Sequence, residues 1–158
     1  MSHYTAQQQR NIDTVNNLFE ADASYDRISI FVRDAVWWNG LPHVANNGAT
    51  EHKGIDAIIR LMSGSGDPSN LKNGIDAYDL TTNRFEDVLV LADGDFVVRQ
   101  HTQKSKTHSG RDYCNVYCFV VKFNDEGKII YLTEHWNTWH AHRFLLDNFH
   151  LEPAHPNG

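Results

Sequence analysis

A glutamate beside a tryptophan near the end of the chain is the first candidate for chemistry. Residues 130–139 alternate as a β-strand does, which puts Glu134 on the same face as Leu132 and Trp136. In an apolar pocket, loss of solvation would raise the pKa of this carboxyl group and let it donate or accept a proton near pH 7. The alternative is an ordinary glutamate at a strand edge, paired in solvent with a lysine or arginine.

Two tyrosines in a neighbouring segment are candidate hydrogen-bond donors. Alternation places four residues on one face of the predicted strand: Tyr113, Asn115, Tyr117 and Phe119. In a dry site, Tyr117, with Asn115 and Tyr113, could donate hydrogen bonds to a substrate carbonyl or to a developing enolate. The alternative is that the tyrosines only pack, with their hydroxyls at a wet rim.

Histidine is abundant, with ten copies, and it is the usual side chain for proton transfer near neutral pH. His101 lies in the middle of a predicted strand, with Arg99 on the same face. His43 and His52 flank a loop that contains residues 45–48. Each of these three histidines is a candidate for the site, and the alternative for each is a solvated or structurally hydrogen-bonded imidazole.

The sequence gives no support for a metal or an organic cofactor. His140 and His142 form an H-x-H pair, but no carboxylate or cysteine stands at ligand spacing beside them. A glycine-rich phosphate loop, a nucleophile elbow and a Cys–His pair are all missing from the sequence. We therefore expect neither nucleotide cofactors nor acyl-enzyme chemistry.

Two adjacent tryptophans, Trp37 and Trp38, lie in a short apolar segment that reads as a strand. Neighbouring side chains of a strand point to opposite faces. We therefore expect one tryptophan to line a pocket and the other to pack outside it or at a subunit contact.

These residues must be positioned by helices and strands that the apolar spacing predicts. Helices are predicted over residues 5–23, 26–32 and 54–62, although the β-branched residues of 26–32 also suit a strand. Strands are predicted over 35–38, 76–83, 85–91, 96–104, 112–124 and 128–139, most of them joined by short turns. Three helices followed by long strands indicate an α+β fold, in which N-terminal helices cover a curved antiparallel sheet and enclose one apolar pocket.

Composition limits the classes of function. The chain has 158 residues, the size of a single domain over 1–158, with frayed ends expected at 1–5 and 152–158. Its net charge is −6, and its 14 lysines and arginines are scattered, so we expect no nucleic-acid partner. We see no signal-peptide pattern and no apolar stretch near the ~20 residues of a membrane span, so we expect a cytoplasmic protein without membrane contact.

Three local patterns, in their order and spacing, carry a resemblance to a known family. They are Asp-Ala-Val-Trp-Trp at 34–38, Gly-Ile-Asp-Ala-Ile at 54–58 and Phe-Asn-Asp-Glu-Gly-Lys-Ile at 123–129. With the element order, they make the chain similar to the nuclear transport factor 2-like (NTF2-like) superfamily, especially its SnoaL-like and ketosteroid isomerase-like enzymes. The resemblance implies a cone with a deep pocket between the helices and the concave face of the sheet.

The resemblance also implies roles for particular residues. Glu134 matches an acid or base of SnoaL-like relatives and would face the cone together with Trp136, as would the face that carries Tyr117. Asp26 matches a catalytic aspartate of dehydratase-type members, although a helix N-cap is the alternative reading. Asn39 matches the position of the isomerases' carboxylate base, which an amide cannot replace in proton transfer at neutral pH.

We therefore expect a cofactor-independent acid–base enzyme of isomerase, cyclase or dehydratase type. Its substrate would be small and hydrophobic, of a polyketide-, steroid- or terpenoid-like kind. The alternative is a non-catalytic small-molecule-binding or dimerisation module, because the same fold serves both purposes. By analogy with the family, a homodimer would form through the outer face of the sheet, which presents Val116, Cys118 and Val120.

Overall fold

The computed structural model describes residues 3–40, 51–73 and 76–146. In chain order, the elements are α1 (Ala6–Glu20), β1 (Phe31–Trp38), β2 (Glu51–Lys53), α2 (Ile55–Ser65), η1 (Pro68–Asn73), η2 (Leu80–Thr82), β3 (Arg84–Asp93), β4 (Phe96–Lys106), β5 (Asp112–Phe123), β6 (Ile129–Trp136), α3 (Thr138–Ala141) and η3 (His142–Leu146). None of the helices in these described ranges is long and apolar enough to cross a membrane.

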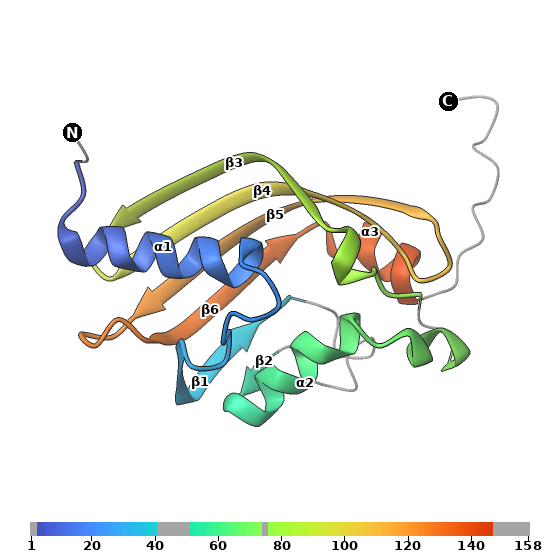
Figure 1. Cartoon of the computed structure of the whole chain (residues 1–158), viewed down its shortest axis with the longest axis horizontal. Coiled ribbons are helices and arrows are strands. Elements are labelled where there is room, and N and C mark those ends of the chain that lie inside the picture. Colours follow the sequence, from blue (N-terminus) through green and yellow to red (C-terminus); the bar gives the residue numbers. More distant parts are fainter. Residues whose placement is uncertain (1–2, 41–50, 74–75, 147–158) are drawn as a thin grey trace.

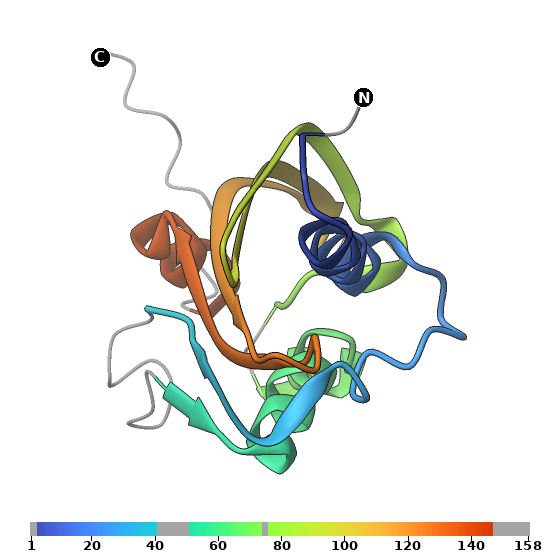
Figure 2. The same ribbon diagram turned by 90° about the vertical axis from the view of Figure 1, so that its left-hand side faces the viewer.

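A single curved sheet of six strands, in the order β2-β1-β6-β5-β4-β3, organises the described part of the chain. Strands β3 to β6 form the antiparallel meander that the sequence predicts. The prediction of a fully antiparallel sheet is wrong at one place, because β1 pairs with β6 in parallel. Helix α1 packs against β3 and β4, and α2 packs against β1 and β2. Both helices lie on the concave side of the sheet (Figure 1, Figure 2).

Helix α1 confirms the first predicted helix and shows how its start is fixed. The Thr5 side chain accepts a hydrogen bond from the backbone N–H of Gln8, and the Gln8 side chain accepts one from the backbone N–H of Thr5. This reciprocal pair satisfies two donors that the first turn leaves without partners. The apolar stripe of the helix, Ile12, Val15 and Leu18, is buried in the core.

The prediction of three N-terminal helices is wrong, because α1 is the only helix before the first strand in the described ranges. Residues 26–30 form turns in which the Asp26 carboxylate accepts from the N–H groups of Ile28 and Ser29. The buried Phe31 then begins β1, which extends four residues further toward the N-terminus than the predicted 35–38. The β-branched residues of 26–32 therefore lie in these turns and at the start of β1, and not in a helix. Helix α2 confirms the predicted helix at 54–62.

Two segments predicted as strands differ in the structure, because a side chain in each accepts a backbone hydrogen bond and starts a helical turn. The segment 76–83 is mostly not a strand, since the Asp79 carboxylate accepts from the backbone of Thr81 and starts the 3₁₀ turn η2. Strand β6 ends at Trp136 and not at residue 139, because the Asn137 side chain accepts from the N–H of His140 and caps α3. The short strand β2 was not predicted at all.

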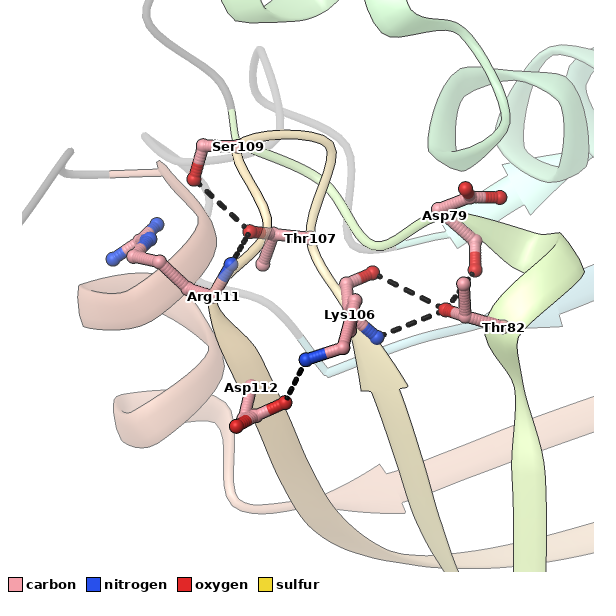
Figure 3. Close-up of polar contacts among 7 residues, drawn as sticks. All are labelled: Asp79, Thr82, Lys106, Thr107, Ser109, Arg111 and Asp112. Carbon is pink, nitrogen blue, oxygen red and sulfur yellow. Dashed lines mark hydrogen bonds and ion pairs between the residues drawn. The ribbon is translucent and has the colours of Figure 1, made fainter.

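Polar contacts stabilise the turn between β4 and β5 and connect it to η2 (Figure 3). The Thr107 hydroxyl accepts from the backbone N–H of Arg111 at 3.1 Å and bonds the Ser109 hydroxyl at 3.1 Å. Beside it, the backbone N–H of Lys106 donates to the Thr82 hydroxyl of η2 at 2.9 Å. These bonds connect the β4–β5 turn to the segment that enters β3.

Candidate functional site

One large cavity lies between the helices and the concave face of the sheet. Its volume is about 1510 Å³, more than most small-molecule sites have. The apolar part of its lining includes Phe19 from α1, Leu61 and Met62 from α2, and Trp37 and Phe119 from the sheet. These elements come from distant parts of the sequence, so the cavity exists only in the folded chain.

Glu134 lies in this lining and is buried, with an exposed fraction of 8%. Its neighbour directly across the sheet is Phe119 on β5. The Glu134 Oε2 atom accepts a hydrogen bond from the Trp37 indole N–H at 2.9 Å. Burial raises the pKa of this carboxyl group to about 8, although the indole hydrogen bond lowers the pKa in part. The alternative of a solvent-paired glutamate at a strand edge is therefore wrong.

Tyr117 also lines the cavity and belongs to a buried polar chain. Its hydroxyl lies 2.9 Å from the Tyr113 hydroxyl, which accepts from the Asn115 Nδ2 atom at 2.9 Å. Burial raises the pKa of both tyrosines, so the hydroxyls stay protonated. When Tyr113 donates to Tyr117, the Tyr117 proton is free for a substrate oxygen. The alternative of hydroxyls at a wet rim does not hold, since both rings are buried.

His101 and Arg99 form a second buried polar group on the same face of the sheet. Arg99 donates from Nε to His101 Nδ1 at 3.1 Å and from Nη1 to Asn16 Oδ1 at 2.5 Å, and it forms an ion pair with Glu20. Burial and the neighbouring Arg99 lower the pKa of His101 to about 4. Since Nδ1 accepts, the proton of the neutral ring is on Nε2.

The ring of His101 is packed among aromatic side chains. Its centroid lies 5.2 Å from that of Phe19 and 4.7 Å from that of Phe85, both edge to face. The ring is only 1% exposed and is not part of the cavity lining, and it accepts the hydrogen bond of Arg99 beneath that lining. His101 therefore contacts Arg99 and is not among the described residues that line the cavity, where the predicted catalytic role would place it.

A third polar group joins β1, β2 and β6 at the lining. The Asn39 amide donates to His52 Nε2 at 3.1 Å, and the backbone carbonyl of Asn39 accepts from the Trp136 indole at 2.6 Å. Burial, and then the charge of Arg60, lower the pKa of His52. All three residues line the cavity.

Trp38 and Asp26 do not join the other predicted residues at this site. Trp38 points to the opposite side of β1 from Trp37, and its ring lies 5.3 Å from that of His135. Asp26 is exposed and holds a turn, so its predicted catalytic role lacks a position in the lining. His43 lies outside the described residues. Among the residues that the structure describes, no group of three histidine, cysteine or acidic side chains could hold a metal ion.

The sequence did not predict the four arginines of the lining as site residues: Arg27, Arg60, Arg84 and Arg99. Arg99 is completely buried, and Arg60 lines the cavity from α2. The alternation of β4 already placed Arg99 on the face of His101, which was a usable signal. Its partner Glu20 lies 79 positions earlier in the chain, and no local pattern connects the two.

Comparison with known proteins gives the fold. No protein-family model matches the chain, and the search of curated proteins gave no match. Three solved structures are similar: an NTF2-like protein of unknown function from Burkholderia pseudomallei (17% identity, TM-score 0.65, 87% of this chain and 98% of that one), a candidate isomerase from Bacillus subtilis (15%, 0.66, 92% and 98%) and a phenazine biosynthesis-related protein from Pseudomonas aeruginosa (16%, 0.62, 88% and 86%). The chain therefore has the NTF2-like fold, and the resemblance stated from the sequence is confirmed at this level.

Proposed function

We propose that the protein is a cofactor-independent enzyme that moves protons on a small hydrophobic substrate, as isomerases, cyclases and dehydratases do. One observation carries the proposal: Glu134 is a buried carboxyl group in a largely apolar cavity, with a pKa raised to about 8. Near that pH both protonation states are populated, so the same group can donate and accept a proton. Similar folds in a candidate isomerase and a phenazine biosynthesis-related protein support this class of reaction.

The chemistry can be written for an isomerisation. The Glu134 carboxylate removes a proton from a carbon next to a carbonyl group, and the electron pair moves onto the carbonyl oxygen. Tyr117 donates a hydrogen bond to that enolate oxygen, and Asn115 supports Tyr117 through Tyr113. In a substrate with a β,γ-double bond, the protonated Glu134 then returns the proton to the γ-carbon. The electron pair moves back from the oxygen, the carbonyl re-forms and the double bond shifts to the α,β-position, so substrate and product are isomers and no redox partner is needed.

A generic proton-transfer reaction tests the role of Glu134 without the natural substrate. When a base removes the ring C–H proton of 5-nitrobenzisoxazole, its N–O bond breaks and a coloured phenolate forms. We expect the protein to accelerate this elimination, with a rate that rises with pH and levels off above about 8 as Glu134 ionises. Glu134→Gln should lower the rate by about 100-fold, the usual worth of a positioned base.

The exposed turn residue Glu126 supplies the control, since Glu126→Gln makes the same side-chain replacement at a residue outside the lining. It should keep both the rate and the pH profile. An unchanged rate in Glu134→Gln would contradict the proposed base and favour the alternative of a non-catalytic binding module.

We also propose that two copies associate through the outer face of the sheet. Leu89, Leu91 and Val116 are apolar and about half exposed on this face, and the register places Leu91 opposite Val98. Analytical ultracentrifugation should show a dimer that Val116→Lys dissociates, because a buried lysine at an apolar contact is costly. Ile59→Lys, at an exposed apolar residue of α2, should remain dimeric. A monomeric wild-type protein would exclude the dimer.

A further inference from the structure

The lining of the cavity carries more positive charge than the acidic chain as a whole would suggest. The formal net charge of the chain is −6. The described lining residues nevertheless include arginines at four positions and glutamates at three: Arg27, Arg60, Arg84, Arg99, Glu20, Glu51 and Glu134.

Each of the three glutamates is accounted for. Glu20 pairs with Arg99, and Glu51 pairs with Lys53 at 2.8 Å. Glu134 is mostly protonated and neutral at pH 7, because burial raises its pKa to about 8. None of the three therefore balances the remaining arginines of the lining.

Arg27 is engaged at the end of α1. Its guanidinium donates to the backbone carbonyls of Leu18, Ala21 and Asp22, where the negative end of the helix dipole lies. Its charge thus has a structural use. Arg60 and Arg84 are left, and among the described residues no carboxylate lies within ion-pair distance of either.

Arg60 is the better placed of the two. It shares the cavity face of α2 with Ala57, Leu61 and Gly64, at helical spacings of three and four, and all four residues line the cavity. Its charge helps to lower the pKa of His52. His52 accepts a hydrogen bond from the Asn39 amide, and the backbone carbonyl of Asn39 accepts one from the indole of Trp136 on β6. Arg84, by contrast, is the first residue of the edge strand β3, directly across from Lys104.

We propose that the substrate carries a carboxylate, which Arg60 binds, and that its apolar body extends past Trp136 toward Glu134. The planar guanidinium of arginine matches a carboxylate with two parallel hydrogen bonds. Arg60 is exposed to solvent where it contributes to the lining, so an arginine without a carboxylate partner stands at the solvent side of an apolar cavity and provides both charge and direction for such a group. The inference rests on the proposed function, because it takes the same cavity as the substrate site.

The test compares an acid with its uncharged ester. N-phenyl-1-naphthylamine, a neutral probe that fluoresces in apolar sites, reports occupancy of the cavity, and 2-naphthoate and methyl 2-naphthoate compete for it. We expect 2-naphthoate to displace the probe at a concentration about tenfold lower than its ester does. In Arg60→Gln this preference should fall about tenfold, since one charged hydrogen-bonded pair is lost, while the ester competes as before.

Arg33→Gln is the matched control, because Arg33 is exposed on β1 outside the lining and its removal changes the net charge equally. It should keep the preference for the acid. Equal competition by acid and ester in the wild type, or a preference that survives in Arg60→Gln, would overturn the proposal. Failure of the neutral probe to bind would contradict an apolar substrate cavity and overturn both proposals.

The proton-transfer rate tests the catalytic role of Glu134 independently of the competition experiment. Glu134→Gln can lose or keep its proton-transfer rate without changing the preference for the acid over the ester. The two experiments therefore distinguish a wrong base from a wrong substrate class.

Discussion

Replacing Glu134 with glutamine should stabilise the protein, and the gain should grow as the pH rises from 5 to 8. The carboxyl group has a pKa of 4.5 in ordinary surroundings and of about 8 in the folded protein. Between these values the unfolded chain loses the proton while the folded protein keeps it, so the free energy of unfolding falls as pH rises. The expected gain in Glu134→Gln between pH 5 and pH 8 is on the order of 3 kcal/mol.

Urea unfolding of both proteins at several pH values would measure this gain. His101 must be considered, because its pKa is lowered from 6.5 to about 4. Over that range the unfolded chain binds the extra proton, so His101 makes stability rise with pH, against the effect of Glu134. Both proteins contain His101, and the difference between them isolates Glu134.

The sharpest region is from about pH 7 to pH 8, where little of the His101 proton remains on the unfolded chain and none on the folded protein, since the ordinary pKa of the ring is 6.5. There the free energy of unfolding of the wild type should fall as the pH rises, while neither residue 134 nor His101 should change that of Glu134→Gln. The Glu126→Gln control, at an exposed turn residue, should follow the wild type. Parallel curves for wild type and Glu134→Gln would show that Glu134 is not buried as an acid.

The inward face of the sheet could be predicted from the sequence because strand alternation is local. A period of two places Glu134 and Trp136 on one face, and Tyr113, Asn115 and Tyr117 on one face of the next strand, whatever the rest of the chain does. The structure puts Glu134, Trp136 and Tyr117 in the cavity lining. The partners could not be predicted, since the Trp37–Glu134 hydrogen bond joins residues 97 positions apart.

The errors in the fold have a similar origin. Residues 26–32 have apolar spacing that suits a helix, but pairing of β1 with β6 recruits Phe31 into a strand. That parallel pairing depends on a strand about 100 residues later, which no local pattern reports. Side-chain caps decided other boundaries, as Asp79 does for η2.

Asp76→Ala should be the most destabilising of these substitutions, and it tests a polar anchor whose residues are not part of the cavity lining. Asp76 is buried, and its carboxylate accepts from the Ser109 N–H at 2.9 Å and from Arg111 Nε at 2.7 Å. Burial raises its pKa, but the hydrogen bonds from Ser109 and Arg111 more than offset this, so the pKa lies below its ordinary value of 3.8. The stability that this group contributes is therefore present at neutral pH and is lost as the pH falls below about 4.

Removing the carboxylate leaves the Arg111 charge and the Ser109 N–H without this acceptor, at a cost of about 3 kcal/mol at pH 7. Arg111 also donates to the backbone carbonyl of Phe144, so the loss should loosen the contact between the β4–β5 turn and η3. Urea unfolding of Asp76→Ala, Arg111→Gln and the double variant would measure the coupling. The double variant should be less destabilised than the two single effects together, because the second change removes the charge that the first left uncompensated. Simple additivity would mean that the pair does not act as a unit, and the anchor would then lie elsewhere in the turn.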